Sequence, residues 1–201
     1  LTVTGFQTPS TRGAAVTVND DGSYTYDPTG VAALEALTAG EEVTDTFTYT
    51  IADDNDVTAT ATVSITVAGV NDPPEAADDS NSTAADTPLD VNAASGVLSN
   101  DSDVDDDNFT VVAFESTSSL GANVTVGEDG SYTYDPTGAT DLIALTEGEE
   151  VVDTFTYTIE DEGSNQATAT VSVTVTGVND PPEAVDDSNS INADTVLAVN
   201  A

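Results

Sequence analysis

The chain has 201 residues, of which 38 are acidic and only one, Arg12, is basic, so its formal net charge is −37. Nucleic acids are therefore excluded as partners and membrane insertion is not expected, because the chain lacks clustered Lys and Arg and has no apolar run of about 20 residues. It also has no His and no Cys, which excludes disulfides, thiolate or imidazole catalysis, and Cys- or His-ligated metals.

In chain order, the first 70 residues indicate a series of short strands. Five segments alternate between apolar or aromatic residues and Thr or Ser, which is the period of a strand with one buried face. They are residues 1–6, 14–18, 23–26, 45–51 and 59–67. Between them lie turn-forming runs such as "NDDG" and "DPTG". Residues 31–40, where Leu34 and Leu37 are three apart, predict a short helical turn ended by Gly40.

An internal repeat organises the chain. "GSYTYDPTG" begins at residues 22 and 130, and "GVNDPPEA" begins at residues 69 and 177, both with an offset of 108. Residues 1–93 align without a gap to residues 109–201, and 63 of the 93 positions are identical. This period exceeds the 20–50 residues of a solenoid unit and matches one independently folding domain. With about seven strands in each 108 residues, the pattern predicts an all-β chain of tandem antiparallel β-sandwich domains.

The repeat also predicts the domain boundaries. Residues 1–76 form a repeat that lacks its opening segment, residues 77–184 form a complete repeat, and residues 185–201 form the opening segment of a third. Two explanations of this frame remain open. Either the sequence is a piece of a longer fibre, or the last segment completes a neighbouring copy by strand donation.

The joint between repeats is a stiff, acidic segment. Pro73 and Pro74 restrict the backbone and favour an extended, polyproline-like linker. Around them lie oxygen-bearing side chains and no cation. A charge of this size opposes compaction, so bound divalent cations or a very salty medium must neutralise part of it. Ca²⁺ takes six to eight oxygen ligands in irregular geometry. The sequence therefore predicts calcium ligands at Asn71, Asp72, Glu75, Asp78 and Asp79.

A second acidic cluster is "NDSDVDDDN" at residues 100–108. The alternating carboxylates are spaced like the first ligands of a calcium loop, and we expect four of them to bind the ion. The cluster is not an EF-hand, because Asp106 replaces the Gly of that motif and Val112 replaces its final Glu. The remaining ligands must therefore come from elsewhere in space. The four expected ligands are Asp101, Asp103, Asp105 and Asp107.

The topology of the predicted sandwich suggests which segments lie near each acidic loop. If the first strand of the sandwich runs parallel to the last, the 101–107 loop is expected near the end of its own repeat. The loop would then lie beside Asn179, Asp180, Asp186 and Asp187. The hairpin acids at residues 53–56 and 160–162 would point to the opposite pole, toward a preceding joint. The alternative is that all these acids are solvated surface charge that serves solubility or salt adaptation.

The motifs "GSYTYDPTG", "DTFTYTI" and "ATATVSVTVTGVNDPP" resemble the VCBS-type and related cadherin-like repeats of very large bacterial surface adhesins. The resemblance covers nearly the whole chain. It implies immunoglobulin/cadherin-like sandwiches, calcium-dependent rigidity, type I secretion to the surface of Gram-negative bacteria, and a role in adhesion or biofilm formation. In such proteins these repeats often act as extenders that hold a ligand-binding tip away from the cell.

Four functions follow from these observations. The first is a non-catalytic, calcium-rigidified extender whose partners are neighbouring repeats of the same chain. The second is a self-assembling extracellular filament joined head to tail by strand donation. The third is a carbohydrate- or protein-binding module, although no Trp-lined or basic site supports it. An enzyme that uses two carboxylates is disfavoured, because the same acids recur at a period of 108 and duplicated active sites are not expected.

Overall fold

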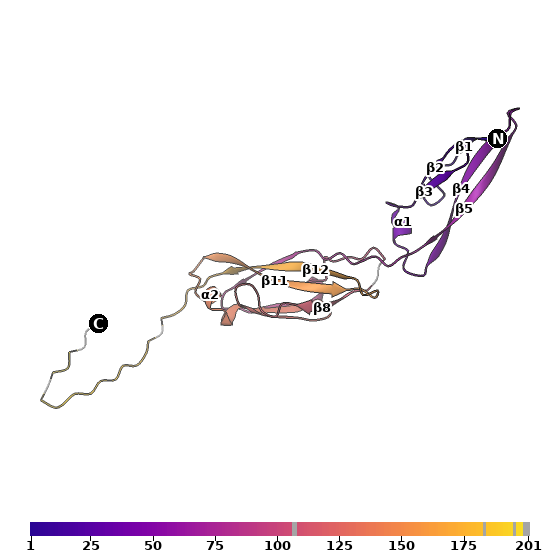
Figure 1. Ribbon diagram of the computed structural model, residues 1–201. Coiled ribbons are helices and arrows are strands. Elements are labelled where there is room, and N and C mark those ends of the chain that lie inside the picture. Colours follow the sequence, from indigo (N-terminus) through magenta and orange to yellow (C-terminus); the bar gives the residue numbers. More distant parts are fainter. Residues whose placement is uncertain (106–107, 183, 195, 199–201) are drawn as a thin grey trace.

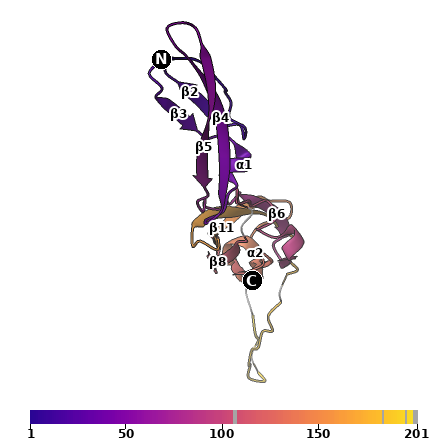
Figure 2. The ribbon, with the colours of Figure 1, turned by 90° about the vertical axis from the view of Figure 1, so that its right-hand side faces the viewer.

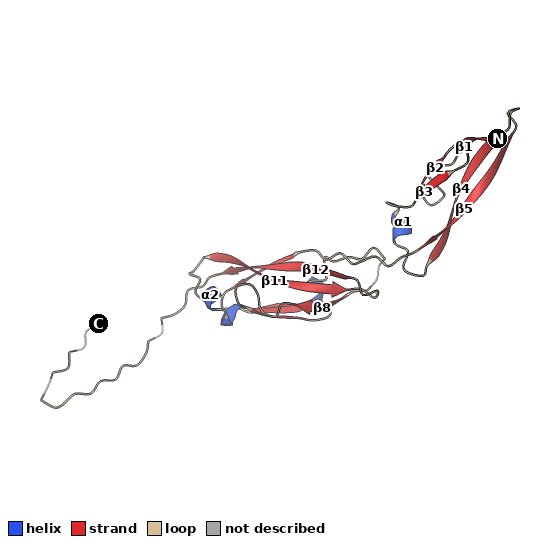
Figure 3. Ribbon diagram, viewed as in Figure 1, coloured by secondary structure: helices blue, strands red, loops and turns tan. Residues whose placement is uncertain are grey.

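The computed structural model describes residues 1–105, 108–182, 184–194 and 196–198. Two β-sandwiches lie end to end, and the chain leaves the far end of the second as an extended segment (Figures 1 and 2). Strands dominate both bodies, and the helices are single turns, so the all-β prediction is confirmed (Figure 3). Within the described ranges, no helix is long and apolar enough to cross a membrane.

The first sandwich contains five strands and one helical turn. A three-stranded sheet has the order β1-β4-β5, and β2 pairs with β3 in a second layer. The long hairpin β4–β5 is antiparallel over its whole length, from Glu42 opposite Ala68 to Ala52 opposite Thr58. The elements are β1 (Thr2–Phe6), β2 (Ala15–Val18), β3 (Tyr24–Asp27), α1 (Ala32–Glu35), β4 (Glu42–Ala52) and β5 (Thr58–Ala68).

The second sandwich has the seven strands that the sequence predicts for a complete repeat. A four-stranded sheet has the order β6-β12-β11-β8, and a three-stranded sheet has the order β7-β10-β9. The strands are β6 (Asp79–Ala84), β7 (Leu89–Val91), β8 (Thr110–Phe114), β9 (Asn123–Val126), β10 (Tyr132–Asp135), β11 (Glu150–Glu160) and β12 (Gln166–Thr176). Single turns lie at η1 (Ala93–Ser95), η2 (Pro136–Gly138) and α2 (Thr140–Ile143).

The alternation in the sequence becomes the two faces of each sheet. In β12, Val171, Val173 and Val175 are fully buried, while the intervening Ser and Thr residues are partly exposed. In the core, Tyr132 packs edge-on against Phe155, with ring centroids 5.7 Å apart. Such pairs stabilise a core beyond the area that they bury. Tyr132 and Phe155 therefore pack the core of the second sandwich, as the sequence indicated.

One sequence expectation is confirmed and another changes in detail. The first strand of the complete repeat runs parallel to the last, as expected, because β6 pairs with β12 from Asp79 opposite Val171 to Ala84 opposite Thr176. The helical turn α1 ends at Glu35, well before Gly40. Gly40 instead has a φ of +92°, the left-handed region that Gly adopts without steric cost, and it lies in the turn before β4.

Candidate metal centre at the junction between repeats

The linker is attached to the N-terminal pole of the second sandwich by main-chain pairing. Glu75 and Ser102 form an antiparallel bridge, in which the Glu75 amide donates to the Ser102 carbonyl at 2.7 Å and the Ser102 amide donates back at 3.0 Å. Pro74, between the linker acids, is buried. The acidic linker and the acidic 101–105 loop therefore lie side by side, although their charges repel each other.

Two more hydrogen bonds bring a third segment to this pole. The Asp72 amide donates to Asp105 Oδ2 at 2.7 Å, and Asn71 Nδ2 donates to Asp161 Oδ2 at 2.8 Å. Asp161 lies in the β11–β12 turn, where the Asn165 amide also donates to it at 2.8 Å. The expectation that a preceding joint meets the hairpin acids is thus confirmed for Asp161. Linker, loop and hairpin meet at one place.

Asp161 is held as a carboxylate by these donors. Burial raises its pKa, but hydrogen bonds from the Asn165 amide and from the side chains of Asn71 and Asn165 outweigh burial and bring the pKa below its ordinary value. An ionised acid at this place adds negative charge to a site that already contains the carboxylates of Asp103 and Asp105. The electrostatic balance favours a cation.

Two carboxylate oxygens at the junction are buried and have no hydrogen-bond partner among the residues that the structure describes. They are Asp103 Oδ2 and Asp105 Oδ1, and Asp105 is only 5% exposed. A buried carboxylate oxygen without a partner costs several kcal/mol unless a cation or a donor compensates it. The single basic side chain cannot do so, because Arg12 lies in the first sandwich, where its Nε donates to the Thr44 carbonyl. The donor set, hard carboxylate and amide oxygens, fits Ca²⁺.

The part of the chain that the structure describes does not assemble a complete site from acidic side chains alone. No group of three or more such side chains there converges closely enough to hold a metal ion. The predicted ligand Asp107 and its neighbour Asp106 lie outside the described residues. The fit of this junction to a calcium ion therefore depends on Asp103 Oδ2 and Asp105 Oδ1, the buried oxygens without a hydrogen-bond partner among the described residues.

Asp79 and Asp101 lie deeper, around the hydroxyl of Tyr157. Tyr157 OH is 3.1 and 3.2 Å from the two carboxylate oxygens of Asp101, and the Ala77 amide donates to Asp101 Oδ1 at 2.8 Å. Asp79 Oδ2 is buried without a partner. Burial, together with the charges of Asp101 and Asp78, raises the pKa of Asp79 to about 6, although the Tyr157 hydrogen bond opposes this. From the sequence, Tyr157 was expected only to pack in the core, and this second role was not predicted.

Asp78 and Glu75 contribute less to the junction. The Asp78 side chain accepts a hydrogen bond from the Thr170 amide at 2.9 Å, on the edge of β12. Glu75 is exposed, and its contact with the loop runs through its main chain. The predicted linker ligands therefore fall into three groups. Asn71 and Asp72 contact the β11–β12 turn and the 101–105 loop, and Asp79 lies near Tyr157. Asp78 and Glu75 contact β12 and the loop main chain.

The expected contact between the 101–107 loop and the end of the same repeat is wrong. The residues concerned at that end are exposed and lie at the C-terminal pole, beyond the last strand: Asn179, Asp180, Asp186 and Asp187. The β11–β12 hairpin fixes this separation, because Glu160 pairs with Gln166 at one end and Glu150 with Thr176 at the other. The physical reason is that β6 does end at the C-terminal pole, but β7 and η1 return the chain to the N-terminal pole before residue 101.

A buried carboxylate clasp recurs in both sandwiches, and the sequence did not reveal it. Asp153 is fully buried, and its Oδ2 accepts from the hydroxyls of Ser118 and Tyr134, the latter at 2.7 Å. Its Oδ1 accepts from the Ser119 hydroxyl and the Leu120 amide at 2.7 and 2.8 Å. Burial raises the pKa of Asp153, but these donors outweigh burial and lower the pKa below its ordinary value. The clasp is structural, because its oxygens are saturated with donors.

The first sandwich contains the same clasp around Asp45, which is also fully buried. Tyr26 OH donates to Asp45 Oδ2 at 2.8 Å, and Thr11 Oγ1 donates to Oδ1 at 2.7 Å. Burial and the bond to Asp45 raise the pKa of Tyr26 to about 12. The sequence signal was present: Ser, Asp and Tyr recur at the same positions in both copies, but they could be read as turn, strand-edge and core residues.

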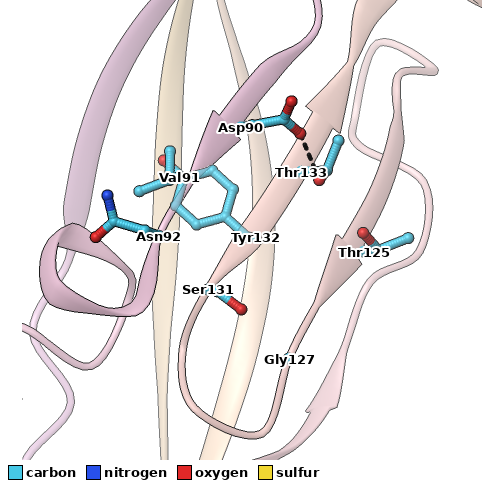
Figure 4. A pocket seen from close by; sticks show the side chains of 8 residues that line it. All are labelled: Asp90, Val91, Asn92, Thr125, Gly127, Ser131, Tyr132 and Thr133. Carbon is cyan, nitrogen blue, oxygen red and sulfur yellow. Dashed lines mark hydrogen bonds between the residues drawn. The ribbon is translucent and has the colours of Figure 1, made fainter.

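An open hollow of about 320 Å³ lies on the second sandwich at β7, β10 and β9 (Figure 4). Asp90 is its one carboxylate, and that side chain accepts a hydrogen bond from Thr133 Oγ1 at 2.8 Å. The ring of Tyr132 is almost wholly buried, so it offers no stacking face to a sugar. This hollow does not bring reactive or ligand-binding groups together.

Two consecutive β-sandwiches, joined by an acidic linker that pairs with the second body, define a tandem-repeat protein of the cadherin and immunoglobulin type. The family model of the bacterial cadherin-like domain matches residues 71–177, and that of the bacterial Ig domain matches residues 1–66. The first match covers more than half of the sequence, and the chain belongs to the bacterial cadherin-like domain family. Domains of these families are typically non-catalytic structural or adhesive modules of extracellular surface proteins, and cadherin-like domains generally bind calcium.

Several solved structures of animal cadherins are similar to the chain. Mouse protocadherin-24 EC1-3 is 17% identical with a TM-score of 0.41, and the match covers 87% of this chain and 57% of that one. Mouse cadherin-23 EC22-24 is 13% identical with a TM-score of 0.42, covering 88% and 51%. Drosophila N-cadherin EC1-3 is 11% identical with a TM-score of 0.39, covering 86% and 54%. The chain thus spans about half the length of these structures. No curated protein sequence matches it significantly.

Proposed function

We propose that the chain is a non-catalytic extender of a bacterial cell-surface adhesin, and that Ca²⁺ at the junction makes it rigid. One observation carries the proposal: Asp103 Oδ2 and Asp105 Oδ1 are buried, with no hydrogen-bond partner in the described part of the chain, at the point where the linker meets the second sandwich. The proposed repeats are residues 1–76, 77–184 and 185–201, with the ion between consecutive repeats. Secretion to the cell surface and a role in biofilm formation belong to the same proposal.

The residues that a bound ion would draw together are Asp103 and Asp105 of the loop, Asn71 and Asp72 of the linker, and Asp161 of the hairpin, because no three acidic side chains of the described residues converge closely enough without it. A bound Ca²⁺ supplies positive charge that turns the repulsion among these groups into attraction to a shared centre. Because the ligands come from three segments, binding would fix the linker against the second sandwich. Without the ion, the main-chain bridge of Glu75 and Ser102 must hold the same place against charge repulsion.

Calcium concentration would make this rigidity depend on location. Extracellular modules bind Ca²⁺ with Kd values of about 10⁻⁴–10⁻³ M. Such sites fill outside the cell and stay empty in the cytoplasm, where the repelling chain remains loose enough for export. A ligand at ten times its Kd stabilises the folded state by about 1.4 kcal/mol for each site.

The test is thermal unfolding of the 201-residue chain in millimolar Ca²⁺ and in chelator. One filled site should raise the Tm by about 5–10 °C, because 1 kcal/mol shifts the Tm of a domain of this size by about 4–8 °C. Asp103→Asn combined with Asp105→Asn should remove most of that shift. The matched control is Asp141→Asn with Glu147→Gln, which removes the same charge from exposed side chains.

The surface-charge alternative makes a different forecast. If the acids only confer solubility, then Ca²⁺ shifts the Tm by a degree or two, and both double variants respond alike. That result would overturn the calcium proposal. An equal effect of Mg²⁺ at the same concentration would also argue against a Ca²⁺-type site, since Mg²⁺ demands regular octahedral geometry.

A further inference from the structure

The linker is held on the second sandwich along most of its length. The amides of Asp72, Glu75 and Ala77 all donate to oxygens of the 101–105 loop, at 2.7, 2.7 and 2.8 Å. Between the last two of these bonds, Ala76 packs against the core of the second sandwich. Backbone that is hydrogen-bonded to a body and packed against its core has the conformation of that body. This part of the linker therefore moves with the second sandwich.

The side chain of Asn71 extends this attachment by one residue. Its Nδ2 donates to Asp161 Oδ2 in the β11–β12 turn at 2.8 Å. The same side chain lies directly against the main chain of Gly163, where an added Cβ would be 2.5 Å from Asn71 Nδ2. Gly163 thus leaves the space that the Asn71 side chain occupies, and a larger residue there would displace it.

The first sandwich holds the chain on the other side, as far as Gly69. The Gly69 amide donates to the Glu41 carbonyl at 2.9 Å. A Cβ on Gly69 would lie 2.2 and 2.3 Å from the carbonyl oxygens of Leu37 and Thr38, so the two backbone segments are in direct contact. Two residues earlier, Val67 packs against the core of the first sandwich. Gly69 therefore moves with the first sandwich.

One residue, Val70, lies between the two attachments. Its side chain is 65% exposed, and its amide and carbonyl have no hydrogen-bond partner among the residues that the structure describes. Within the same described part of the chain, no hydrogen bond joins residues 1–69 to residues 71–182. The apolar cores are also separate, since one cluster belongs to each sandwich. The two bodies are thus connected through Val70 and its two peptide bonds.

We infer that Val70 is the hinge between the two sandwiches, and that Asn71 and Gly163 set its limit by holding the linker on the second sandwich without a bound ion. A hinge is a short segment that absorbs the change in φ and ψ while its neighbours stay fixed. Planar peptide bonds leave this hinge only a few soft torsions. The relative motion of the repeats is therefore rotation about one point, which differs from the free wandering of a flexible linker.

The inference does not depend on the calcium proposal, but it has a consequence for it. All the residues that a bound ion would draw together follow Val70 in the sequence. An ion at the junction would thus stiffen the linker on the second sandwich, and its ligands would not span the hinge. The orientation of the first sandwich would remain a matter of the Val70 torsions.

Amide hydrogen exchange of the 201-residue chain, followed by solution NMR, tests the inference residue by residue. In chelator, the amides of Gly69, Asp72 and Glu75 should exchange at least about tenfold more slowly than those of Val70 and Asn71, because only the first three are hydrogen-bonded. The same pattern is expected in Ca²⁺. Fast exchange of Asp72 and Glu75 at the rate of Val70 in chelator would overturn the inference, since the linker would then be a free tether.

Spin labels measure the motion across the hinge, because the chain has no Cys of its own. Thr62→Cys and Ser80→Cys place one label at an exposed strand position of each sandwich. In this labelled chain, Val70→Gly should widen the distribution of label distances at least about twofold, since Gly removes the torsional restriction of a β-branched residue. Glu75→Gly is the matched control and should leave the distribution unchanged, because hydrogen bonds on both sides of that residue fix its backbone. Equal widening by both replacements would contradict a hinge at Val70.

Gly163→Ala tests the limit that Asn71 sets. The added methyl group should displace the Asn71 side chain, so that residue 71 joins the hinge and the label distances spread further, while the Glu75 amide stays protected. Gly5→Ala is the control, because a Cβ there meets no atom within 4 Å. Circular dichroism verifies that each variant is folded. A Gly163→Ala distribution equal to that of the control would refute the role of Asn71 and Gly163.

Both measurements are made in chelator and in Ca²⁺, which separates this inference from the calcium proposal. Protected linker amides in chelator, without any calcium-dependent Tm shift, would support the hinge and leave the calcium extender refuted. Protection of the linker amides that appears only in Ca²⁺ would do the reverse, because the ion and not the linker's own contacts would then hold it in place.

Discussion

The Asp153 clasp offers the most direct test of how this acidic chain keeps buried charge. In Asp153→Asn the side chain keeps its shape, but an amide group replaces one of the two acceptor oxygens. If the amide takes the place of Oδ2, the hydroxyls of Ser118 and Tyr134 lose their acceptor. If it takes the place of Oδ1, the Ser119 hydroxyl and the main-chain amides of Leu120 and Thr154 lose theirs. Either orientation removes at least two charge-assisted hydrogen bonds.

The size of the effect follows from those bonds. Each hydrogen bond to a charged group contributes about 1.5–3 kcal/mol, so losing two destabilises the second sandwich by about 3–5 kcal/mol. The loss should lower its Tm by more than about 10 °C, since 1 kcal/mol corresponds to about 4–8 °C in a domain of this size. Asp141→Asn, at an exposed position, should change the free energy of unfolding by less than about 0.5 kcal/mol.

The assay is hydrogen exchange of residues 150–160, followed by mass spectrometry, together with thermal unfolding by circular dichroism. Because the folded pKa of Asp153 is depressed, its contribution is present above the unfolded pKa near 4 and is lost as pH falls through the folded pKa. The variant should therefore lose less stability than the wild type on acidification below pH 4. A variant within about 1 kcal/mol of the wild type at pH 7 would refute this reasoning.

Three further predictions concern the rest of the chain. The pKa of Asp79 is raised to about 6, so the folded state binds the proton more tightly than the unfolded state does, and the free energy of unfolding in chelator should fall as pH rises from about 4 to 6. Asp79→Asn should therefore be more stable than the wild type by about 1–2 kcal/mol at pH 7.5 and equally stable near pH 4, measured by denaturant unfolding. Gly69→Ala places a Cβ 2.2 Å from the Leu37 carbonyl oxygen and should cost about 2 kcal/mol or more, whereas Gly5→Ala, with no atom within 4 Å, should cost less than about 1 kcal/mol by the same assay. In chelator, raising NaCl from about 0.05 to 1 M should raise the Tm, because screening reduces self-repulsion; a flat response would show that repulsion does not limit stability.

The sequence predicted the fold well because sandwiches are specified by local alternation. The period-2 patterns of residues 45–51 and 59–67 became the hairpin β4–β5, and the repeat offset of 108 correctly implied two bodies of the same kind. The helical turn was predicted at the correct place but too long, since the prediction covered residues 31–40 and only the four residues Ala32–Glu35 are helical. Short helices end where tertiary contacts require it, which composition does not reveal.

The candidate site was predicted in part, and the limit was topology. Local density of carboxylates singled out Asp72, Asp103 and Asp105, which the structure brings to one pole. The end of the domain predicted for the 101–107 loop was wrong, because a sequence pattern indicates strands but not how often the chain crosses the sandwich between them. The returning strand β7 has only three residues, Leu89–Val91, and carries too little pattern to be recognised. The roles of Tyr157 and Asp153 depend on contacts between residues 19 to 80 positions apart, which no local motif contains.

The parallel pairing of β6 with β12 has a mechanical consequence for a chain under tension. Strand β6 begins opposite the middle of β12 and runs parallel to it up to the end of β12, so a pull on the two ends of the repeat drags these strands past each other along their length. The load then falls on all the bonds from Asp79 to Ala84 together, in shear, and the pair does not peel open one bond at a time. A repeat with this strand order therefore resists a pull along its length through its main-chain pairing alone.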